Sequence, residues 1–561
     1  MKKFCILTAL LIASISAIFA QESPKELPYS FTHRDISYKI DEITLPSIDN
    51  EALLNEDAQN TDKFKLLRVG VGHDVQYSLS NCGRTDILND GSKLWRVKFE
   101  SKDAIMMNLI FDKFNIPEEG KMFIYTPDHE QVYGPYTNAD LQEVGKLSTD
   151  DIIGEELIAE YYEPADASFN GEFRIVCVTH VYKDFLHVLP EDRGPHGSAE
   201  GNCHIDVVCP IAADWRAPIN SVVCISITAY VPSEGGWGMY ICSGAMINNV
   251  RMDKTPYVLS ANHCVAATDQ THKFYFNYQT ALCGGTTGTS NYAASGGVIV
   301  ARSNENSDNY NSSSDFLLLK ITGNIGVLYR DSIVFAGWDR SGAASIGAGI
   351  HHPGGDWKKI SFPKSVTTVT SGNLKNKYFE VRWQSNPNRG VTEEGSSGSP
   401  LFNNHSLIIG TLTAGSSSCS YTSGSDLYGR LAYHWNNNGA TAANRKLQPW
   451  LDPDNTGTTV LKGMRYDGSV ITGIEDHKDA YETFSVAPNP VSSDYVTING
   501  NFLTENAVCN IYNTMGQLVM TRDIETSASF QMNVTGLTNG VYFVEIQGSE
   551  HNYKSKIIIS R

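Results

Sequence analysis

The sequence predicts an all-β protein made of several folded units, and three observations carry this prediction. The chain has 561 residues, which is too long for one ordinary domain. Short apolar runs recur along most of its length, and many alternate with polar residues. From about residue 199 onward, these runs are separated by Gly, Ser, Thr and Asn, as in β-barrels and β-sandwiches.

The first 20 residues predict a signal peptide. Lys2 and Lys3 form a basic start, a mostly apolar run extends from Phe4 to Phe19, and the small residue Ala20 precedes a plausible cleavage point. An uncleaved anchor is the alternative, but the apolar run is short for one. The protein is therefore expected to cross an inner membrane, where disulfides become permissible.

Residues 21–198 are expected to form a β-rich propeptide. The alternating runs Leu94–Phe99 and Met122–Tyr125 predict strands. The region ends in Glu191–Ser198, a polar stretch with Gly and Pro that suits proteolytic cutting. We interpret it as a folded segment that holds the next domain inactive or helps it fold. An ordinary accessory domain is the alternative.

The rest of the chain predicts two further β units joined by a linker. Residues 199–467 have the length of two small barrels, residues 468–485 are expected to be the linker, and residues 486–561 form a small sandwich. The runs that predict their strands include Val222–Tyr230, Tyr257–Ser260, Leu407–Leu412, Ile511–Val519, Gly536–Ile546 and Lys554–Ile559.

The formal net charge of −18 excludes some partners. It argues against nucleic acid or an anionic membrane surface as a non-specific partner, and weakly favours a cationic substrate. Solubility is its simplest explanation. No metal or organic cofactor is expected: the cysteines show no paired CxxC spacing, and the adjacent His351 and His352 usually point in different directions on a strand.

Three motifs in residues 199–467 carry chemistry. Ser397 lies between glycines in Glu394–Pro400, His263 lies in Leu259–Cys264, and Asp315 precedes the apolar run Phe316–Leu319. A serine hydroxyl needs a base in reach, and the base needs a group that fixes its tautomer.

We therefore assign Ser397 as nucleophile, His263 as general base and then acid, and Asp315 as the orienting carboxylate. The backbone N–H groups of Gly395 and Ser397 are expected to form the oxyanion hole. Each residue alone has an ordinary alternative, such as a turn residue or a loop. The chain order His, Asp, Ser is that of the chymotrypsin fold.

The stretch from Cys203 to about Gly463 closely resembles bacterial lysyl endopeptidases, the lysine-specific branch of the trypsin-like serine proteases. The resemblance implies a chymotrypsin-like double β-barrel. Besides the His263 and Asp315 motifs above, the matching segments are Ile205–Pro210, Phe335–Arg340, Ile350–Pro353, Gly390–Pro400, Ser425–Arg430 and Trp450–Pro453.

Cysteine spacing alone cannot give the disulfide pairing. The resemblance implies the pairs Cys203–Cys419, Cys209–Cys283 and Cys242–Cys264. It leaves Cys224 over as a buried thiol, and the states of Cys82, Cys177 and Cys509 stay open.

The resemblance also implies where a substrate binds. Asp426 is expected to receive the ammonium of a lysine at P1, the residue before the scissile bond; a turn aspartate is the alternative. The segment Thr413, Ala414 and Gly415 is expected to bind the substrate backbone as an edge strand. The family's histidine is Thr413 here, and the tryptophan that stacks on it has no clear counterpart, which puts the rate and the preference for lysine over arginine in doubt.

Residues 486–561 resemble the type A sorting domain of the type IX secretion system. The segments that carry the resemblance are Pro488–Pro490, Tyr512–Gln517, Leu537–Val544 and Lys556–Ile559. It implies export through the type IX machinery, followed by release or attachment to the outer cell surface. A small adhesive or carbohydrate-binding sandwich is the alternative.

The sequence thus predicts a secreted, monomeric lysine-specific serine endopeptidase with its own propeptide. Its substrates are expected to be proteins and peptides. A protease that accepts both lysine and arginine, and a non-catalytic surface-binding protein on a protease fold, are the alternatives.

Overall fold

The computed structural model describes most of the chain as two compact units. One comprises the described residues up to Val207 together with Pro218–Ser469, and the other comprises Val208–Ala217 with the described residues from Val470 onward. The described ranges are 26–33, 36, 39–59, 66–141, 145–189, 203–267, 270–289, 292–303, 315–323, 325, 333–385, 390–437, 439–471, 485–487, 491–492, 494–499, 507–513, 518–524, 529–547 and 552–561.

Some predicted segments fall outside these ranges. The predicted signal peptide, the stretch Glu191–Ser198 and most of the predicted linker lie outside the described residues. Within the described part, no helix has both the length and the apolar character that crossing a membrane requires.

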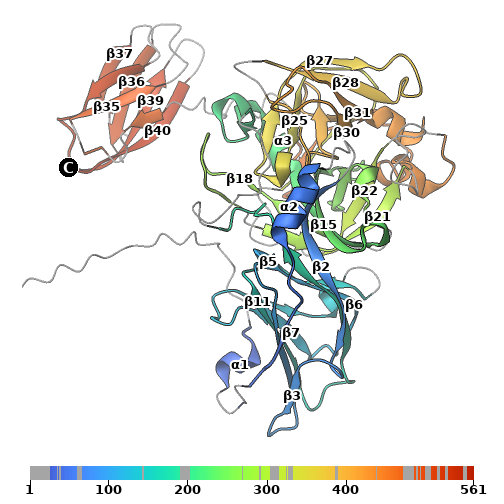
Figure 1. The fold of residues 1–561 in the computed structure, drawn as a ribbon. Coiled ribbons are helices and arrows are strands. Elements are labelled where there is room, and N and C mark those ends of the chain that lie inside the picture. Colours follow the sequence, from blue (N-terminus) through green and yellow to red (C-terminus); the bar gives the residue numbers. More distant parts are fainter. Residues whose placement is uncertain are drawn as a thin grey trace, which may run out of the picture. The chain divides into compact units, whose positions relative to one another are not determined.

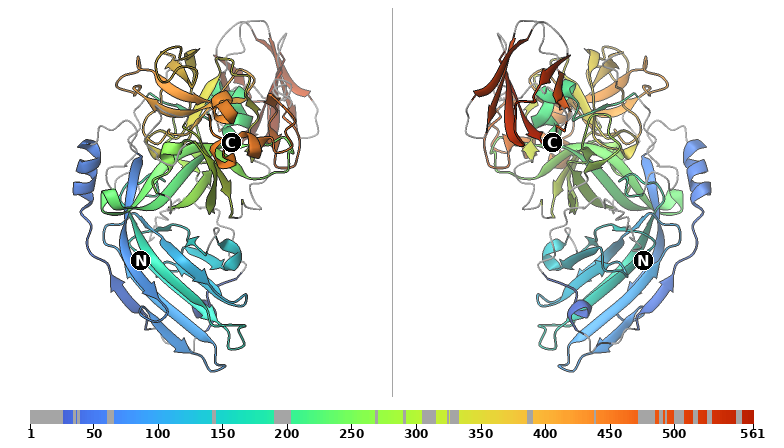
Figure 2. Two further views of the ribbon diagram at one scale, coloured as in Figure 1. Left: turned by 90° about the vertical axis from the view of Figure 1, so that its right-hand side faces the viewer. Right: turned by 90° about the vertical axis from the view of Figure 1, so that its left-hand side faces the viewer.

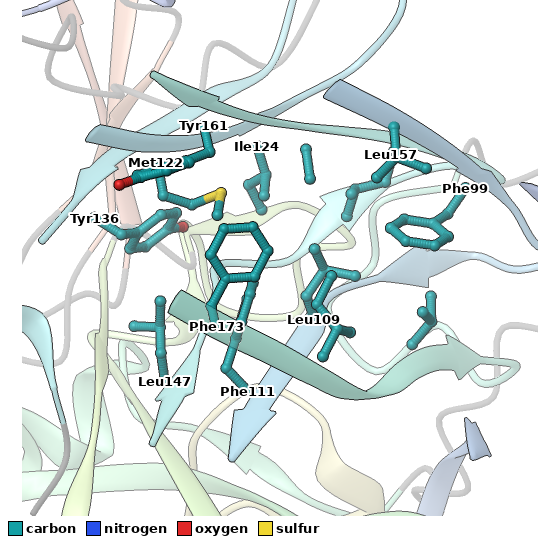
Figure 3. Close-up of a cluster of buried hydrophobic side chains, with 14 of the residues drawn as sticks. Phe99, Leu109, Phe111, Met122, Ile124, Tyr136, Leu147, Leu157, Tyr161 and Phe173 are labelled. Carbon is teal, nitrogen blue, oxygen red and sulfur yellow. The ribbon is translucent and has the colours of Figure 1, made fainter. Parts of the chain in front are cut away.

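The N-terminal region is a two-layer β structure, and the strands predicted at Leu94–Phe99 and Met122–Tyr125 are confirmed. One sheet has the order β1-β4-β11-β7-β8, and β12 pairs with β2, β5 and β6 in the other. Apolar residues from both sheets form one core, which includes Phe99, Phe111, Met122, Leu157 and Phe173 (Figure 3). The bounds are α1 Tyr29–Thr32, β1 Asp41–Thr44, α2 Asn50–Gln59, β2 Leu67–Ser78, β3 Arg84–Ile87, β4 Lys93–Glu100, β5 Met106–Met107, β6 Leu109–Asn115, β7 Lys121–Tyr125, β8 Val132–Tyr136, β9 Leu147–Ser148, β10 Ile152–Ile153, β11 Glu156–Glu163 and β12 Glu172–Val181.

The next strands close into a first barrel. Its order is β14-β15-β16-β22-β21, and β20 returns through β17 to β14. Only Gly296, with a φ of 96°, separates β20 from β21. One bent strand therefore closes the barrel, as glycine allows at such a corner. The bounds are β14 Val222–Val231, β15 Gly236–Ile247, β16 Tyr257–Ser260, β17 Gln270–Phe276, β20 Tyr292–Ser295, β21 Gly297–Arg302 and β22 Leu317–Ile321.

A second barrel follows in the same unit. Its order is β26-β25-β29-β30-β31-β28-β27, and only Phe362 separates β26 from β27. This closure confirms the predicted all-β double barrel. The bounds are β25 Ala348–His351, β26 Lys359–Ser361, β27 Pro363–Thr368, β28 Tyr378–Trp383, β29 Pro400–Phe402, β30 Ile408–Gly415 and β31 Asp426–Arg430.

Short elements surround the two barrels. Strand β13 pairs with β26, β24 pairs with β30 and β32, β18 pairs with β19, and β23 pairs with β33. Their bounds are β13 Ile205–Asp206, α3 Arg216–Ser221, β18 Gln279–Thr280, β19 Gly288–Thr289, β23 Val334–Phe335, β24 Trp338–Asp339, α4 Gln448–Leu451, β32 Val460–Leu461 and β33 Met464–Arg465.

One strand of the N-terminal region joins the first barrel. Strand β2 pairs with β12 on one side and antiparallel with β15 on the other. The two regions of this unit therefore share one continuous sheet (Figure 1).

The C-terminal strands form a separate small sandwich, as predicted. A three-stranded sheet, β34-β35-β38, and a four-stranded sheet, β37-β36-β39-β40, form this unit (Figure 2). They enclose an apolar core that includes Val496, Ile511, Val544 and Ile557. The bounds are β34 Ser485–Ala487, β35 Tyr495–Asn499, β36 Ala507–Asn513, β37 Leu518–Ile524, β38 Ser529–Asn533, β39 Gly540–Gln547 and β40 Asn552–Ile559.

Candidate active site

Ser397 lies on a tight turn that the first barrel holds in place. The backbone N–H of Ser243 in β15 donates to the Ser397 carbonyl at 2.8 Å, and the Ser243 hydroxyl donates to the Gly395 carbonyl at 2.9 Å. Gly395 and Gly398 have φ values of 85° and 80°, which L side chains rarely adopt. A Cβ on Gly398 would also overlap the Ser260 hydroxyl oxygen. The turn therefore requires glycine on both sides of the serine.

His263 and Asp315 meet because their strands pair. Strand β16 ends at Ser260, opposite Leu317 at the start of β22. His263 follows the first strand and Asp315 precedes the second. The Nδ1 of His263 donates to Asp315 Oδ2 at 2.7 Å, and the His263 backbone N–H donates to Oδ1 at 2.9 Å.

The His263 ring is left with one available nitrogen. His263 and Asp315 are both buried, and His263 Nε2 has no hydrogen-bond partner in the described part of the chain. The Cys242–Cys264 disulfide ties the neighbour of His263 to β15, the strand that holds the Ser397 turn. This arrangement can fix one tautomer of the imidazole and leave Nε2 as a base.

The Ser397 turn also offers backbone donors. Among the described residues, the N–H groups of Gly395 and Ser397 donate to no protein acceptor, whereas the intervening Ser396 N–H donates to the Glu393 carbonyl at 3.1 Å. Two available N–H groups on one turn can stabilise an oxyanion.

Asp426 begins β31 and is fully buried. Its Oδ2 accepts hydrogen bonds from Trp383 Nε1 at 2.5 Å, from Thr392 Oγ1 at 2.7 Å and from the Ser417 hydroxyl. All three donors are neutral, and no Lys, Arg or His of the described residues forms an ion pair with Asp426. Burial raises the pKa of Asp426, although these hydrogen bonds oppose the shift. Such a carboxylate can bind a cation supplied by a ligand.

The segment Thr413–Gly415 lies at the C-terminal end of β30, where one edge of the strand is open. In β30, pairing with β29 ends at Thr411, whereas pairing with β31 continues to Gly415 opposite Asp426. On the β29 side, no described strand pairs with residues 413–415. The Thr413 hydroxyl is buried without a hydrogen-bond partner among the described residues.

Sequence reasoning did not identify His434, a buried residue near Asp315. Its ring is fully buried, 5.3 Å from the Phe316 ring, and its Nε2 lies 3.2 Å from Thr411 Oγ1. Burial lowers the pKa of His434 to about 4, and the charge of Asp315 acts in the opposite direction. No sequence motif marks His434. Ser243 was also missed, because a serine inside a strand carries no signal.

The adjacent histidines His351 and His352 are both buried but bond to different groups. His351 Nδ1 lies 2.8 Å from Ser396 Oγ, and His352 Nδ1 donates to the Asp356 carbonyl at 2.9 Å. His351 therefore bonds within the Ser397 turn, and His352 bonds to the neighbouring segment at Asp356.

Six of the described cysteines are disulfide-bonded. The structure joins Cys203 to Cys419 and Cys242 to Cys264, and Cys209 and Cys283 are disulfide-bonded as well. The remaining described cysteines, Cys82, Cys177, Cys224 and Cys509, are free and buried.

Comparison with known proteins matches two regions of the chain. Residues 197–429 match the family described as lysyl endopeptidase, C-terminal domain, and residues 485–560 match the secretion system C-terminal sorting domain. The sorting-domain match indicates export by type IX secretion.

A lysyl endopeptidase from Pseudomonas aeruginosa is 32% identical over 258 residues, which cover 45% of this chain and 52% of the relative. The chain thus spans about half the length of that curated relative.

Solved structures are more distant. The atomic-resolution structure of HBP has 14% identity and a TM-score of 0.27, and the match covers 39% of this chain and 89% of that one. An immunoglobulin-like β-sandwich protein of the DUF3244 family from Bacteroides vulgatus has 16% identity and a TM-score of 0.12, over 14% of this chain and 83% of that one.

Proposed function

We propose that the protein is an exported serine endopeptidase that cleaves polypeptides on the carboxyl side of lysine. One observation carries the proposal: the His263 ring is bonded through Nδ1 to buried Asp315, and its Nε2 is unpartnered among the described residues. The Ser397 turn packs on the same loop, with the Ser397 carbonyl 3.8 Å from Cys264 Sγ.

In the proposed reaction, Ser397 Oγ attacks the substrate carbonyl carbon while His263 Nε2 takes the hydroxyl proton. The N–H groups of Gly395 and Ser397 stabilise the oxyanion. His263 then gives its proton to the leaving amine, and an acyl-enzyme remains. Water hydrolyses the ester by the same transfers in reverse. Asp315 orients the ring and stabilises the imidazolium.

Asp426 is the proposed determinant of lysine specificity. The substrate backbone adds to the open edge at Thr413–Gly415, which places the side chain at P1 toward Asp426, the cross-strand partner of Gly415. The buried carboxylate lacks a cation among its bonded neighbours, so an ammonium ligand compensates its charge. A compact ammonium fits a point carboxylate, whereas a guanidinium needs a planar fork of acceptors.

The flanking regions have roles in biogenesis. Residues 21–198 act as a propeptide whose β2 is paired with the first barrel. Residues 486–561 engage the type IX secretion machinery, and the mature enzyme acts as a monomer without metal or cofactor. The sorting-domain match supports the role of the C-terminal residues, and the pairing of β2 with β15 supports an association of residues 21–198 with the first barrel.

The test is cleavage of two chromogenic peptides that are identical except for lysine or arginine at P1. The enzyme is used without its N-terminal region, and Ser397→Ala serves as the inactive control. We expect lysine-only turnover that Ser397→Ala abolishes. Comparable turnover of the arginine peptide would reduce the proposal to a general trypsin-like protease. An inactive enzyme that still binds lysyl peptides would support a binding protein instead.

A further inference from the structure

The first described residues after the predicted propeptide are held against the second barrel. Cys203 is joined to Cys419 by a disulfide. Strand β13 pairs antiparallel with β26, and Lys359 Nζ of β26 donates to Asp206 Oδ1 at 2.8 Å, with both side chains buried. His204 lies between these two attachments, so its backbone is fixed on either side.

The side chain of His204 contacts a carboxylate inside the protein. The His204 side chain is 1% exposed and that of Glu393 is 16% exposed, and His204 Nε2 lies 2.9 Å from Glu393 Oε2. Because an ionised carboxylate only accepts hydrogen bonds, Nε2 carries the hydrogen. His204 Nδ1 is buried without a hydrogen-bond partner among the described residues. The ring is therefore bonded through Nε2, to Glu393.

Glu393 begins the turn that leads to Ser397. Its carbonyl accepts from the Ser396 N–H at 3.1 Å, and its own N–H donates to Ser396 Oγ at 3.2 Å. Its second carboxylate oxygen, Oε1, accepts from the Cys419 N–H at 3.0 Å. The backbone of Glu393 thus belongs to the turn, and its carboxylate ties the turn to His204 and Cys419.

The proposed oxyanion donors depend on the position of this turn. The N–H groups of Gly395 and Ser397 flank Ser396, whose N–H is held by the Glu393 carbonyl. From the first barrel, the Ser243 N–H holds the Ser397 carbonyl at 2.8 Å. The turn is therefore fixed at its end by Ser243 and at its start through the Glu393 carboxylate. A shift of Glu393 would move both donors.

We propose that His204 is a positioning residue, which donates to Glu393 and thereby holds the Ser397 turn in the geometry that stabilises an oxyanion. The inference rests on the proposed function. In this role His204 acts through Glu393 and does not contact the substrate. A displacement of about 1 Å at a reacting group can cost about 10²-fold in rate, so the contact should act mainly on kcat.

The first test compares variants of His204 on the lysyl peptide. Each variant is made as the full chain and assayed after removal of its N-terminal region. His204→Ala is expected to lower kcat about 10- to 100-fold. Its KM should change less than about threefold, because Asp426 keeps its donors. His204→Gln places an amide donor near the same carboxylate, and its kcat is expected to stay within about threefold of the wild type.

Two inhibitors separate the oxyanion donors from the Asp426 site. With a peptide aldehyde that ends in lysinal, Ser397 Oγ adds to the aldehyde carbon, His263 takes the hydroxyl proton, and the carbonyl oxygen becomes an oxyanion. In His204→Ala, the inhibition constant of this aldehyde should rise by the same factor as kcat falls. Hexylamine offers an ammonium and forms no oxyanion, so its inhibition constant should stay within about twofold.

A double-mutant cycle tests whether His204 acts through Glu393. Glu393→Ala should lower kcat at least as much as His204→Ala, and the double variant should lose no more than Glu393→Ala alone. Asp206→Asn is the matched control, because it weakens the attachment of the same segment at Lys359 without changing a contact of the turn. It is expected to lower Tm, since Lys359 is buried, and to leave kcat within about twofold.

The results distinguish this inference from the proposed function. A wild type that cleaves the lysyl peptide, together with an unchanged kcat in His204→Ala, would overturn the inference alone. Equal losses of kcat in His204→Ala and Asp206→Asn, equal losses in His204→Ala and His204→Gln, or independent losses in the double variant would do the same. A wild type that cleaves no lysyl peptide would overturn the proposed function and this inference with it.

Discussion

Asp315 and Asp426 are both buried aspartates of the double barrel, but their partners differ in charge. Asp315 accepts from the ring and the backbone of His263, whose ring can become a cation. Asp426 accepts from Trp383, Thr392 and Ser417, which all stay neutral. A buried carboxylate is costly unless it is paired. The chain itself supplies a group beside Asp315 that can carry a positive charge, whereas the proposed function assigns the cation beside Asp426 to the substrate.

The largest expected effect comes from removing the charge of Asp315. Asp315→Asn keeps the shape but cannot hold the required His263 tautomer. We expect kcat to fall about 10⁴-fold, the loss known for this change in the chymotrypsin-type triad. The loss should be equal for a lysyl peptide and for a peptide with an uncharged P1 side chain, because Asp315 acts on the chemistry. A loss confined to the lysyl peptide would assign Asp315 to specificity.

The same change at Asp426 should act on the substrate side chain instead. Asp426→Asn is expected to lower kcat/KM for the lysyl peptide by about 10²- to 10³-fold, since a buried charge pair loses one partner. Turnover of a matched peptide with acetyl-lysine at P1 should change little. Steady-state kinetics on the two peptides separate these outcomes, and parallel losses would contradict a specificity role.

The two aspartates illustrate which features could be predicted from the sequence and which could not. The runs that became β4, β7 and β16 were predictable because alternation and burial are local properties. The three residues of the proposed triad could be singled out because each lies in a short motif. The donors to Asp426 are 43, 34 and 9 residues away in the chain, and nothing local links them to it.

The pairing of strands that are distant in the chain could not be predicted from the sequence either. The contact between Leu67 and Ile241 depends on a register between strands of two regions, and either strand has an apolar pattern that suits many partners. The position of His434 near Asp315 depends on how the barrel closes. These features follow from tertiary packing, which residue patterns in one sequence do not encode visibly.

A smaller effect is expected from narrowing the approach to Asp426. A Cβ on Gly415 would overlap Asp426 Oδ1, so Gly415→Ala must displace the carboxylate or fill the space beside it. We expect a loss of about tenfold or more in kcat/KM for the lysyl peptide, with less effect on an alanyl peptide. Gly236→Ala is the matched control, because its added Cβ meets nothing within 4 Å. Equal turnover by both variants would remove Gly415 from the binding site.

The smallest effect is a dependence on pH that only one aspartate should produce. Burial raises the pKa of Asp426 above its ordinary 3.8, so acidification protonates it earlier than an exposed aspartate. The protonated form cannot pair with an ammonium. The ratio of kcat/KM for the lysyl peptide to that for the acetyl-lysyl peptide should therefore fall at acid pH, by at most about tenfold per pH unit. Any effect of pH that is common to the two peptides cancels in the ratio.

The same protonation should act on stability with the opposite sign. Between the unfolded value of 3.8 and the raised folded pKa, the native state binds more protons than the unfolded chain, so this carboxyl contributes more stability as the pH falls. Asp426→Asn should abolish both the fall in the peptide ratio and this share of the pH dependence in thermal unfolding. If the ratio stays constant from neutral to acid pH in the wild type, the substrate ammonium does not bind an ionised Asp426. That result would contradict the proposed difference between Asp426, which pairs with the substrate, and Asp315, which pairs within the chain.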